Sequence, residues 1–120
     1  MPDTPTIEAL HAAWVDAFNR HDLDAHAALY TEDAMLFGSI ADLVLGREGI
    51  RKYFGGRGPG VHVKRYPFPR VVQLTPDTAA TAAHVDFADG DALMPYRVTW
   101  MLVKRNGNWQ IAQHHGSPRV

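Results

Sequence analysis

Two adjacent histidines, His114 and His115, lie in the segment "WQIAQHHGS" at residues 109–117. Imidazole is the side chain best suited to proton transfer near neutral pH. Successive residues of a β-strand point to opposite faces, so the two rings cannot enter one pocket or chelate one metal together. Trp109 and Ile111 assign the odd positions to the interior. The alternation therefore predicts that His115 faces a pocket as an acid/base and that His114 faces outward.

A second pair with possible acid/base chemistry is His84 and Asp86 in "AAHVDF". A carboxylate two residues from an imidazole on one strand face can orient the ring and raise its basicity. If that face is concave, the pair joins His115 in a general acid/base set. If it is convex, the two are polar residues of a dimer interface, and the more apolar Val85 and Phe87 favour this alternative.

Aromatic side chains supply the remaining candidates. The hydroxyl of Tyr30 can donate to a developing enolate oxygen, which makes Tyr30 a candidate catalytic residue. An apolar pocket with a few polar groups suits a hydrophobic small molecule, although packing in the core is the alternative for each residue. The predicted substrate-binding residues are Trp14, Phe18, Phe37, Tyr53, Phe54, Trp100, Gln113 and Ser117.

No motif indicates a metal or a cofactor, and we expect neither. There is no cysteine, no H-E-x-x-H and no G-x-G-x-x-G. The glycine-rich "GGRGPG" follows a predicted helix and precedes a strand, whereas a phosphate cradle requires the reverse order. We interpret it as a flexible rim of the pocket. Asp16 and Arg20 are four apart on a predicted helix, which favours a solvated ion pair.

Length and charge narrow the class of protein. A chain of 120 residues predicts one domain, 1–120, and the formal net charge of −1 provides no basic face for nucleic acid. The N-terminal residues have neither the positive nor the apolar region of a secretory signal. No apolar run reaches the roughly 18 residues of a membrane span. We therefore expect a cytoplasmic domain that binds neither membrane nor nucleic acid.

The elements that must position these residues follow from the periodicity of apolar side chains. Helical spacing predicts helices over 6–20, 23–30 and 46–54. Strands are expected at 34–38, 61–75, 78–87, 93–105 and 109–117, the second of them bent by Pro67 and Pro69. The Asn-Gly at 106–107 predicts a tight hairpin turn. Helices first and antiparallel strands later indicate an α+β fold, with one sheet face under the three helices.

Three segments in this order resemble the nuclear transport factor 2-like superfamily, also called cystatin-like or ketosteroid isomerase-like. They are "YTEDAMLFGS", "GREGIRKYF" and "KRNGNWQIAQHHGS". The ending is most similar to the small bacterial branch of SnoaL-like, polyketide cyclase-like proteins, and also resembles the association domain of calcium/calmodulin-dependent protein kinase II. The resemblance implies a curved sheet wrapped around three helices as a cone, an internal pocket, and homodimers formed by sheet faces.

The resemblance leaves two functions open, because the superfamily includes isomerases, dehydratases, cyclases and members without catalysis. One is cofactor-independent acid/base chemistry on a hydrophobic substrate, which a dry pocket with a perturbed imidazole would favour. The other is a non-catalytic ligand-binding or dimeric assembly domain, which a pocket filled by Trp100 and Phe54 would favour. The half-apolar outward set Thr99, Met101 and Val103 predicts a homodimer.

Overall fold

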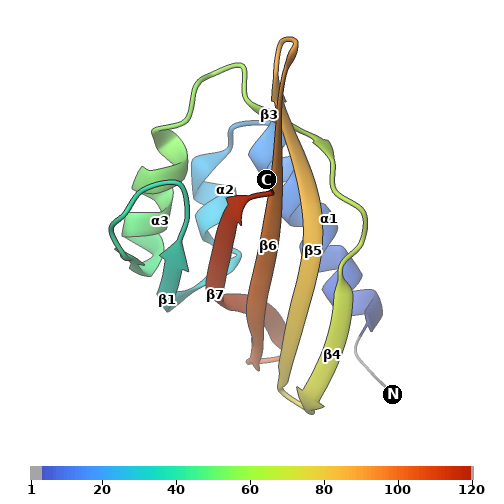
Figure 1. Ribbon diagram of the computed structural model, residues 1–120. Helices are drawn as coiled ribbons and strands as arrows, with labels where there is room; N and C mark the ends of the chain where they lie inside the picture. Colours follow the sequence, from blue (N-terminus) through green and yellow to red (C-terminus); the bar gives the residue numbers. More distant parts are fainter. Residues whose placement is uncertain (1–3, 120) are drawn as a thin grey trace.

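A curved, open sheet of seven strands forms the frame of the computed structural model, which describes residues 4–119, and three helices pack along one side of it (Figure 1). The helices are α1 (Thr4–Asn19), α2 (Leu23–Ala27) and α3 (Gly46–Gly55). The strands are β1 (Tyr30–Phe37), β2 (Val44–Leu45), β3 (His62–Arg65), β4 (Arg70–Thr75), β5 (Thr78–Asp89), β6 (Ala92–Arg105) and β7 (Asn108–Pro118). Their order in the sheet is β2-β1-β7-β6-β5-β3, with β4 also paired to β5. The α+β prediction is confirmed.

The long helix α1 forms where the apolar spacing predicts it. Ile7, Leu10, Trp14 and Phe18 are buried against the sheet, because residues three and four apart share one face of a helix. The opposite face is solvated and carries the Asp16–Arg20 ion pair, whose Nε and Oδ2 atoms are 2.9 Å apart. That prediction is confirmed.

Two element boundaries differ from the sequence prediction. Helix α2 ends at Ala27, so Tyr30, which we expected at the end of this helix, is instead the first residue of β1. The segment 61–75 is divided into β3 and β4, and residues 66–69 between them are in neither strand. Pro67 and Pro69 have no N–H to donate to a ladder, which explains the interruption.

The β6–β7 hairpin contains an irregularity that determines the site. Its turn is as predicted, with positive φ at Asn106 (54°) and Gly107 (79°). In the ladder, Leu102 pairs with Ile111 but Met101 pairs with Gln113, so Ala112 is an extra residue in β7. Such a β-bulge reverses the in–out alternation beyond it. Even-numbered positions of β7 therefore face the helices from residue 114 onward.

The sheet is completed by a parallel pairing between β1 and β7. Leu36 pairs with His114 and Phe37 with His115, and the register shifts between Tyr30 and Met35. This pairing brings β1 and β7 side by side in the sheet, where α3 packs on β1 and α1 contacts β7. It places Tyr30 within reach of His114, 84 residues away along the chain.

Candidate functional site

A cavity of about 710 Å³ opens between the helix-covered face of the sheet and helices α1 and α3. This volume lies within the roughly 300–1,000 Å³ typical of small-molecule sites. Its deep wall is largely aromatic and aliphatic, and one imidazole reaches it. The wall includes Trp14, Phe18, Tyr53, Phe54, Tyr66, His114 and Gly116.

His114 is the imidazole of this wall, and its hydrogen bonds define its tautomer. The ring is buried, and Trp100 Nε1 lies 3.1 Å from its Nδ1. Because an indole nitrogen is only a donor, Nδ1 must accept and cannot carry a hydrogen. The neutral ring therefore carries its proton on Nε2.

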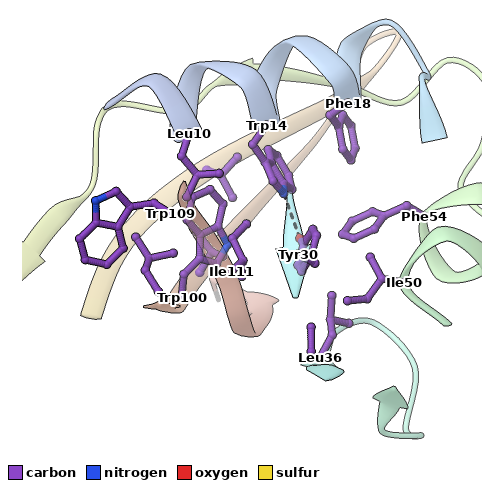
Figure 2. Close-up of a cluster of buried hydrophobic side chains, with 14 of the residues drawn as sticks. Leu10, Trp14, Phe18, Tyr30, Leu36, Ile50, Phe54, Trp100, Trp109 and Ile111 are labelled. Atoms are coloured by element: carbon purple, nitrogen blue, oxygen red, sulfur yellow. Dashed lines mark hydrogen bonds between the residues drawn. The ribbon is translucent and has the colours of Figure 1, made fainter. Parts of the chain in front are cut away.

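Tyr30 fixes the same ring from a second direction. Its hydroxyl lies 2.9 Å from His114 Nδ1, and since that nitrogen has no hydrogen, the hydroxyl is the donor. The Tyr30 oxygen in turn accepts a hydrogen bond of 2.9 Å from Trp14 Nε1, the dashed line in Figure 2. Burial raises the pKa of Tyr30 well above its ordinary value. Tyr30 thus holds His114 in place and keeps its own proton.

The environment of His114 also sets its charge. Burial in this apolar wall, with smaller contributions from the neighbouring His26 and His115, lowers the pKa of His114 to about 3. Protonating Nδ1 would also forfeit the hydrogen bond from Trp100, whose indole N–H can only donate. At neutral pH the ring is uncharged, so it can donate a hydrogen bond from Nε2 but is a poor base.

Gly116 leaves space beside that donor. It is buried, it lines the cavity with His114, and a Cβ built on it would lie 3.4 Å from His114 Nε2. A side chain at position 116 would therefore occupy the approach to the N–H group. The geometry offers one neutral donor in an apolar cavity, the arrangement that binds or polarises a carbonyl oxygen.

The mouth of the cavity is formed partly by the loop between β1 and β2. The Tyr53 hydroxyl accepts a hydrogen bond of 2.8 Å from Ser39 N and lies 3.1 Å from Ser39 Oγ. Gly38 permits this contact, because a Cβ there would lie 2.1 Å from the Tyr53 hydroxyl oxygen. Asp42, on the same loop, is the one carboxylate among the described residues that line the cavity.

Four predicted substrate-binding residues lie in the cavity wall: Trp14, Phe18, Tyr53 and Phe54. Their aromatic side chains line the space without filling it. The predicted lining residue Trp100 is instead buried behind His114, where its role is to donate to Nδ1.

The predicted orientation of the two histidines is wrong. His115 is exposed on the opposite face of the sheet, and His114 is the ring inside, because the bulge at Ala112 reverses the alternation. The same reversal removes Gln113 from the cavity, since it lines a separate, smaller hollow with His115.

Two other predicted binding residues also lie on the outer face. Phe37 pairs with His115 in the ladder, its ring is 6.0 Å from the imidazole, and it is 42% exposed. Ser117 pairs with the exposed Arg97 and is half-buried. Neither lines the cavity.

His84 and Asp86 also lie on the outer face of the sheet, away from the cavity. His84 is exposed and pairs with Arg97, while Asp86 forms an ion pair of 3.1 Å with Arg119 Nη2. The interior positions of β5 are Val85 and Phe87, both of which line the cavity. The predicted acid/base set with His115 therefore does not assemble.

Sequence reasoning missed four residues of the site: His114, Gly116, Asp42 and Tyr66. Tyr66 directly precedes the first of the two prolines that break the strand and lines the cavity, and burial raises its pKa. The small Gly116 beside two histidines was the available signal, because a glycine inside a strand often marks close approach of another group.

Within residues 4–119, no three side chains of His, Asp or Glu are grouped as a metal site would require. No helix in the described part of the chain is long and apolar enough to cross a membrane.

Comparisons with solved structures agree with this architecture. A ketosteroid isomerase-like protein from Erwinia carotovora atroseptica SCRI1043 is 26% identical, with 97% of this chain and 95% of that chain covered and a TM-score of 0.84. A candidate calcium/calmodulin dependent protein kinase II association domain from Xanthomonas campestris is 25% identical, with coverage of 99% and 89% and a TM-score of 0.86. An NTF2-like protein with a cystatin-like fold from Novosphingobium aromaticivorans is 16% identical, with coverage of 97% and 81% and a TM-score of 0.83.

The comparison with curated proteins finds no match. The sequence model of the SnoaL-like domain matches residues 7–120, which is nearly the whole chain. It spans every element that forms the cavity from Ile7 onward. This chain therefore belongs to the SnoaL-like domain family, within the NTF2-like superfamily.

Proposed function

We propose that the protein binds a hydrophobic small molecule in the cavity and that His114 donates a hydrogen bond from Nε2 to an oxygen of that molecule. The main support for this proposal is the fixed orientation of the His114 ring. Its Nδ1 accepts hydrogen bonds from Trp100 and Tyr30, and its Nε2 lies beside Gly116. A single well-placed polar group in an apolar cavity gives a ligand its orientation.

A matched pair of probes tests this proposal. The ketone 2-acetylnaphthalene and the hydrocarbon 2-isopropenylnaphthalene have the same shape, but only the ketone has an acceptor oxygen. We expect the ketone to bind about fivefold more tightly by calorimetry, the value of one net hydrogen bond of about 1 kcal/mol. Equal affinities, or no binding of either, would overturn the proposal.

Two substitutions assign the preference to His114. In Gly116→Ala the new methyl group lies 3.4 Å from Nε2 and obstructs it, so the preference for the ketone should disappear. His115→Gln is the control, because His115 is the adjacent residue on the opposite, exposed face. The His115→Gln variant should prefer the ketone to the hydrocarbon by the same factor as the unmodified protein.

The same geometry supports cofactor-independent chemistry of the isomerase, cyclase or dehydratase type. We assign Asp42 as the base, which takes a proton from the carbon next to a carbonyl. The electron pair moves to the oxygen, where the Nε2–H of His114 stabilises the enolate. Return of the proton to carbon completes the cycle. The ketosteroid isomerase-like description of the Erwinia structure supports this class.

Exchange of the acetyl protons of 2-acetylnaphthalene in D₂O, followed by NMR, tests this step. Enzyme-dependent exchange that Asp42→Asn reduces at least about tenfold would support it, in line with general-base catalysis. Binding without exchange would instead favour the second candidate, a non-catalytic ligand-binding domain. That candidate has one observation in its favour: Asp42 is exposed on a loop, outside the buried wall.

We also propose a homodimer formed by the outer sheet face. Thr99, Met101 and Val103 are exposed or half-buried there, and Val72 is 54% exposed. Phe37 and Met35 continue this apolar surface onto β1, at 42% and 43% exposure. A face of this kind is typical of an association surface.

A further inference from the structure

At the mouth of the cavity basic residues outnumber acidic ones, whereas in the whole chain the two kinds are nearly equal in number. The chain contains 12 basic and 13 acidic residues. Among the described residues lining the cavity, the basic ones on its helical side are Lys52 and Arg57, and the acidic one is Asp42. Arg97 also borders the cavity, but it pairs with His84 and Ser117 on the outer face of the sheet. The apolar interior thus opens through a mouth of positive charge, which attracts anions.

Arg57 is the most firmly held of these cations. Its Nη2 donates to the Phe18 carbonyl oxygen at 2.6 Å and its Nη1 to the Phe54 carbonyl oxygen at 3.0 Å. The guanidinium also lies over the Phe18 ring, 3.8 Å from the centroid. It therefore sits at the carboxyl ends of α1 and α3, against the aromatic wall.

This guanidinium is half-buried, and no carboxylate of residues 4–119 lies within 4.0 Å of it. Burial lowers the pKa of Arg57 for the same reason that it makes the charge costly. The helix ends offset part of that cost, and an anion in the cavity would offset more.

Lys52 differs from the arginines on its own helix. Arg51 Nε lies 2.6 Å from Asp24 Oδ1, and Arg47 Nη1 lies 3.8 Å from Glu32 Oε1. Lys52, which lines the cavity, has no such carboxylate partner in the described part of the chain. On α3, Arg47 and Arg51 do not line the cavity and are paired with carboxylates, whereas Lys52 at the mouth is not paired with any carboxylate of residues 4–119.

We infer that the ligand is an amphipathic carboxylate, with a hydrophobic body in the cavity and its anionic group at the mouth near Lys52 and Arg57. This inference rests on the proposed function and specifies the class of ligand. The acceptor oxygen that meets His114 is then at the inner end of the molecule. A hydrophobic keto acid has both groups.

The test compares 6-acetyl-2-naphthoate with 2-acetylnaphthalene, which has the same ketone and ring system without the carboxylate. We expect the acid to bind at least about threefold more tightly at low ionic strength, the range of a partly exposed ion pair. The advantage should shrink as salt is added, because exposed charges are screened.

Substitutions locate the anion. Lys52→Glu should abolish or reverse the preference for the acid, whereas Arg51→Met, on the same helix but directed to Asp24, should preserve it. Arg57 is left unchanged because it also binds the ends of two helices. A preference that persists in Lys52→Glu would overturn the placement at the mouth.

The two proposals fail separately. If both naphthyl compounds bind equally well, the inferred ligand class is wrong while hydrophobic binding in the cavity stands. If neither compound binds, the proposed function fails, and the inference falls with it.

Discussion

The imidazole of His114 accepts hydrogen bonds at Nδ1 and has an N–H group at Nε2 that faces the cavity. Both residues that donate to Nδ1 are themselves buried. Trp100 is 2% exposed and Tyr30 is 0% exposed. In such surroundings a group that loses its partner bears the full cost of desolvation. The orientation of the ring is therefore coupled to the stability of the fold.

Tyr30→Phe should expose this coupling. The change removes the hydroxyl that receives the hydrogen bond from Trp14 and donates to His114, leaving the indole N–H without its partner. We expect a loss of about 1–3 kcal/mol in the free energy of unfolding, measured with urea. Tyr96→Phe is the control, because Tyr96 is only half-buried. Equal losses would show that the hydroxyl of Tyr30 has no special role.

The pH dependence of stability follows from two buried histidines. Burial lowers the pKa of both His26 and His114 to about 3, from 6.5. Between these values the unfolded chain binds more protons than the folded one, so stability is complete above pH 6.5 and falls as the pH decreases. Each histidine contributes a slope of up to about 1.4 kcal/mol per pH unit.

Urea unfolding from pH 7.5 to pH 5 checks this slope. His26 is the residue to replace, because its Nε2 is buried without a hydrogen-bond partner and its ring packs 4.5 Å from that of Phe54. His26→Leu should remove about half of the slope while leaving His114 in place. An unchanged slope in this variant would contradict the assignment.

At the scale of elements, the periodic segments of the sequence were predictable and the irregular ones were not. The apolar spacing of α1 and the Asn106–Gly107 turn are local properties, and both appear as expected. The bulge at Ala112 depends on pairing with β6 and β1, which no local pattern in "QIAQHH" reveals. A single extra residue therefore exchanged the predicted roles of His114 and His115 and moved Gln113 and Ser117 out of the predicted site.

The loop between β1 and β2 depends on one close contact. A methyl group at Gly38 would lie 2.1 Å from the Tyr53 hydroxyl oxygen, a distance that requires one of the two to move. Gly38→Ala should cost about 1–3 kcal/mol of unfolding free energy, as overpacking does. Adding Tyr53→Ala should recover part of that loss in a double-mutant cycle. Additive effects would show that the contact does not hold the loop.

At the scale of the whole molecule, the two faces of the sheet differ in what they carry. One face carries the cavity under α1 and α3, and the other carries Thr99, Met101, His115 and the exposed apolar residues of β1 and β4. A second, smaller hollow of about 380 Å³ lies on this outer face. The exposed apolar side chains on this face include Met35 and Phe37 of β1 and Val72 and Leu74 of β4.

Sedimentation at micromolar concentration should therefore give twice the monomer mass of 13.3 kDa. Met101→Glu places a charge at the centre of the outer face and should shift the equilibrium to monomer, while Glu8→Gln on the solvated side of α1 should not. A monomeric unmodified protein would refute the dimer. Binding of the naphthyl probes should survive dissociation, because the cavity lies on the other side of the sheet.

The parallel pairing of β1 with β7 has a consequence for biosynthesis. Tyr30 leaves the ribosome long before residues 109–118, yet its hydroxyl finds its acceptor only on that later strand. Contacts so distant along the chain form late and slowly. The nascent polypeptide must therefore keep the Tyr30 hydroxyl without its final acceptor until translation has passed His114, and during that interval it should depend on chaperones.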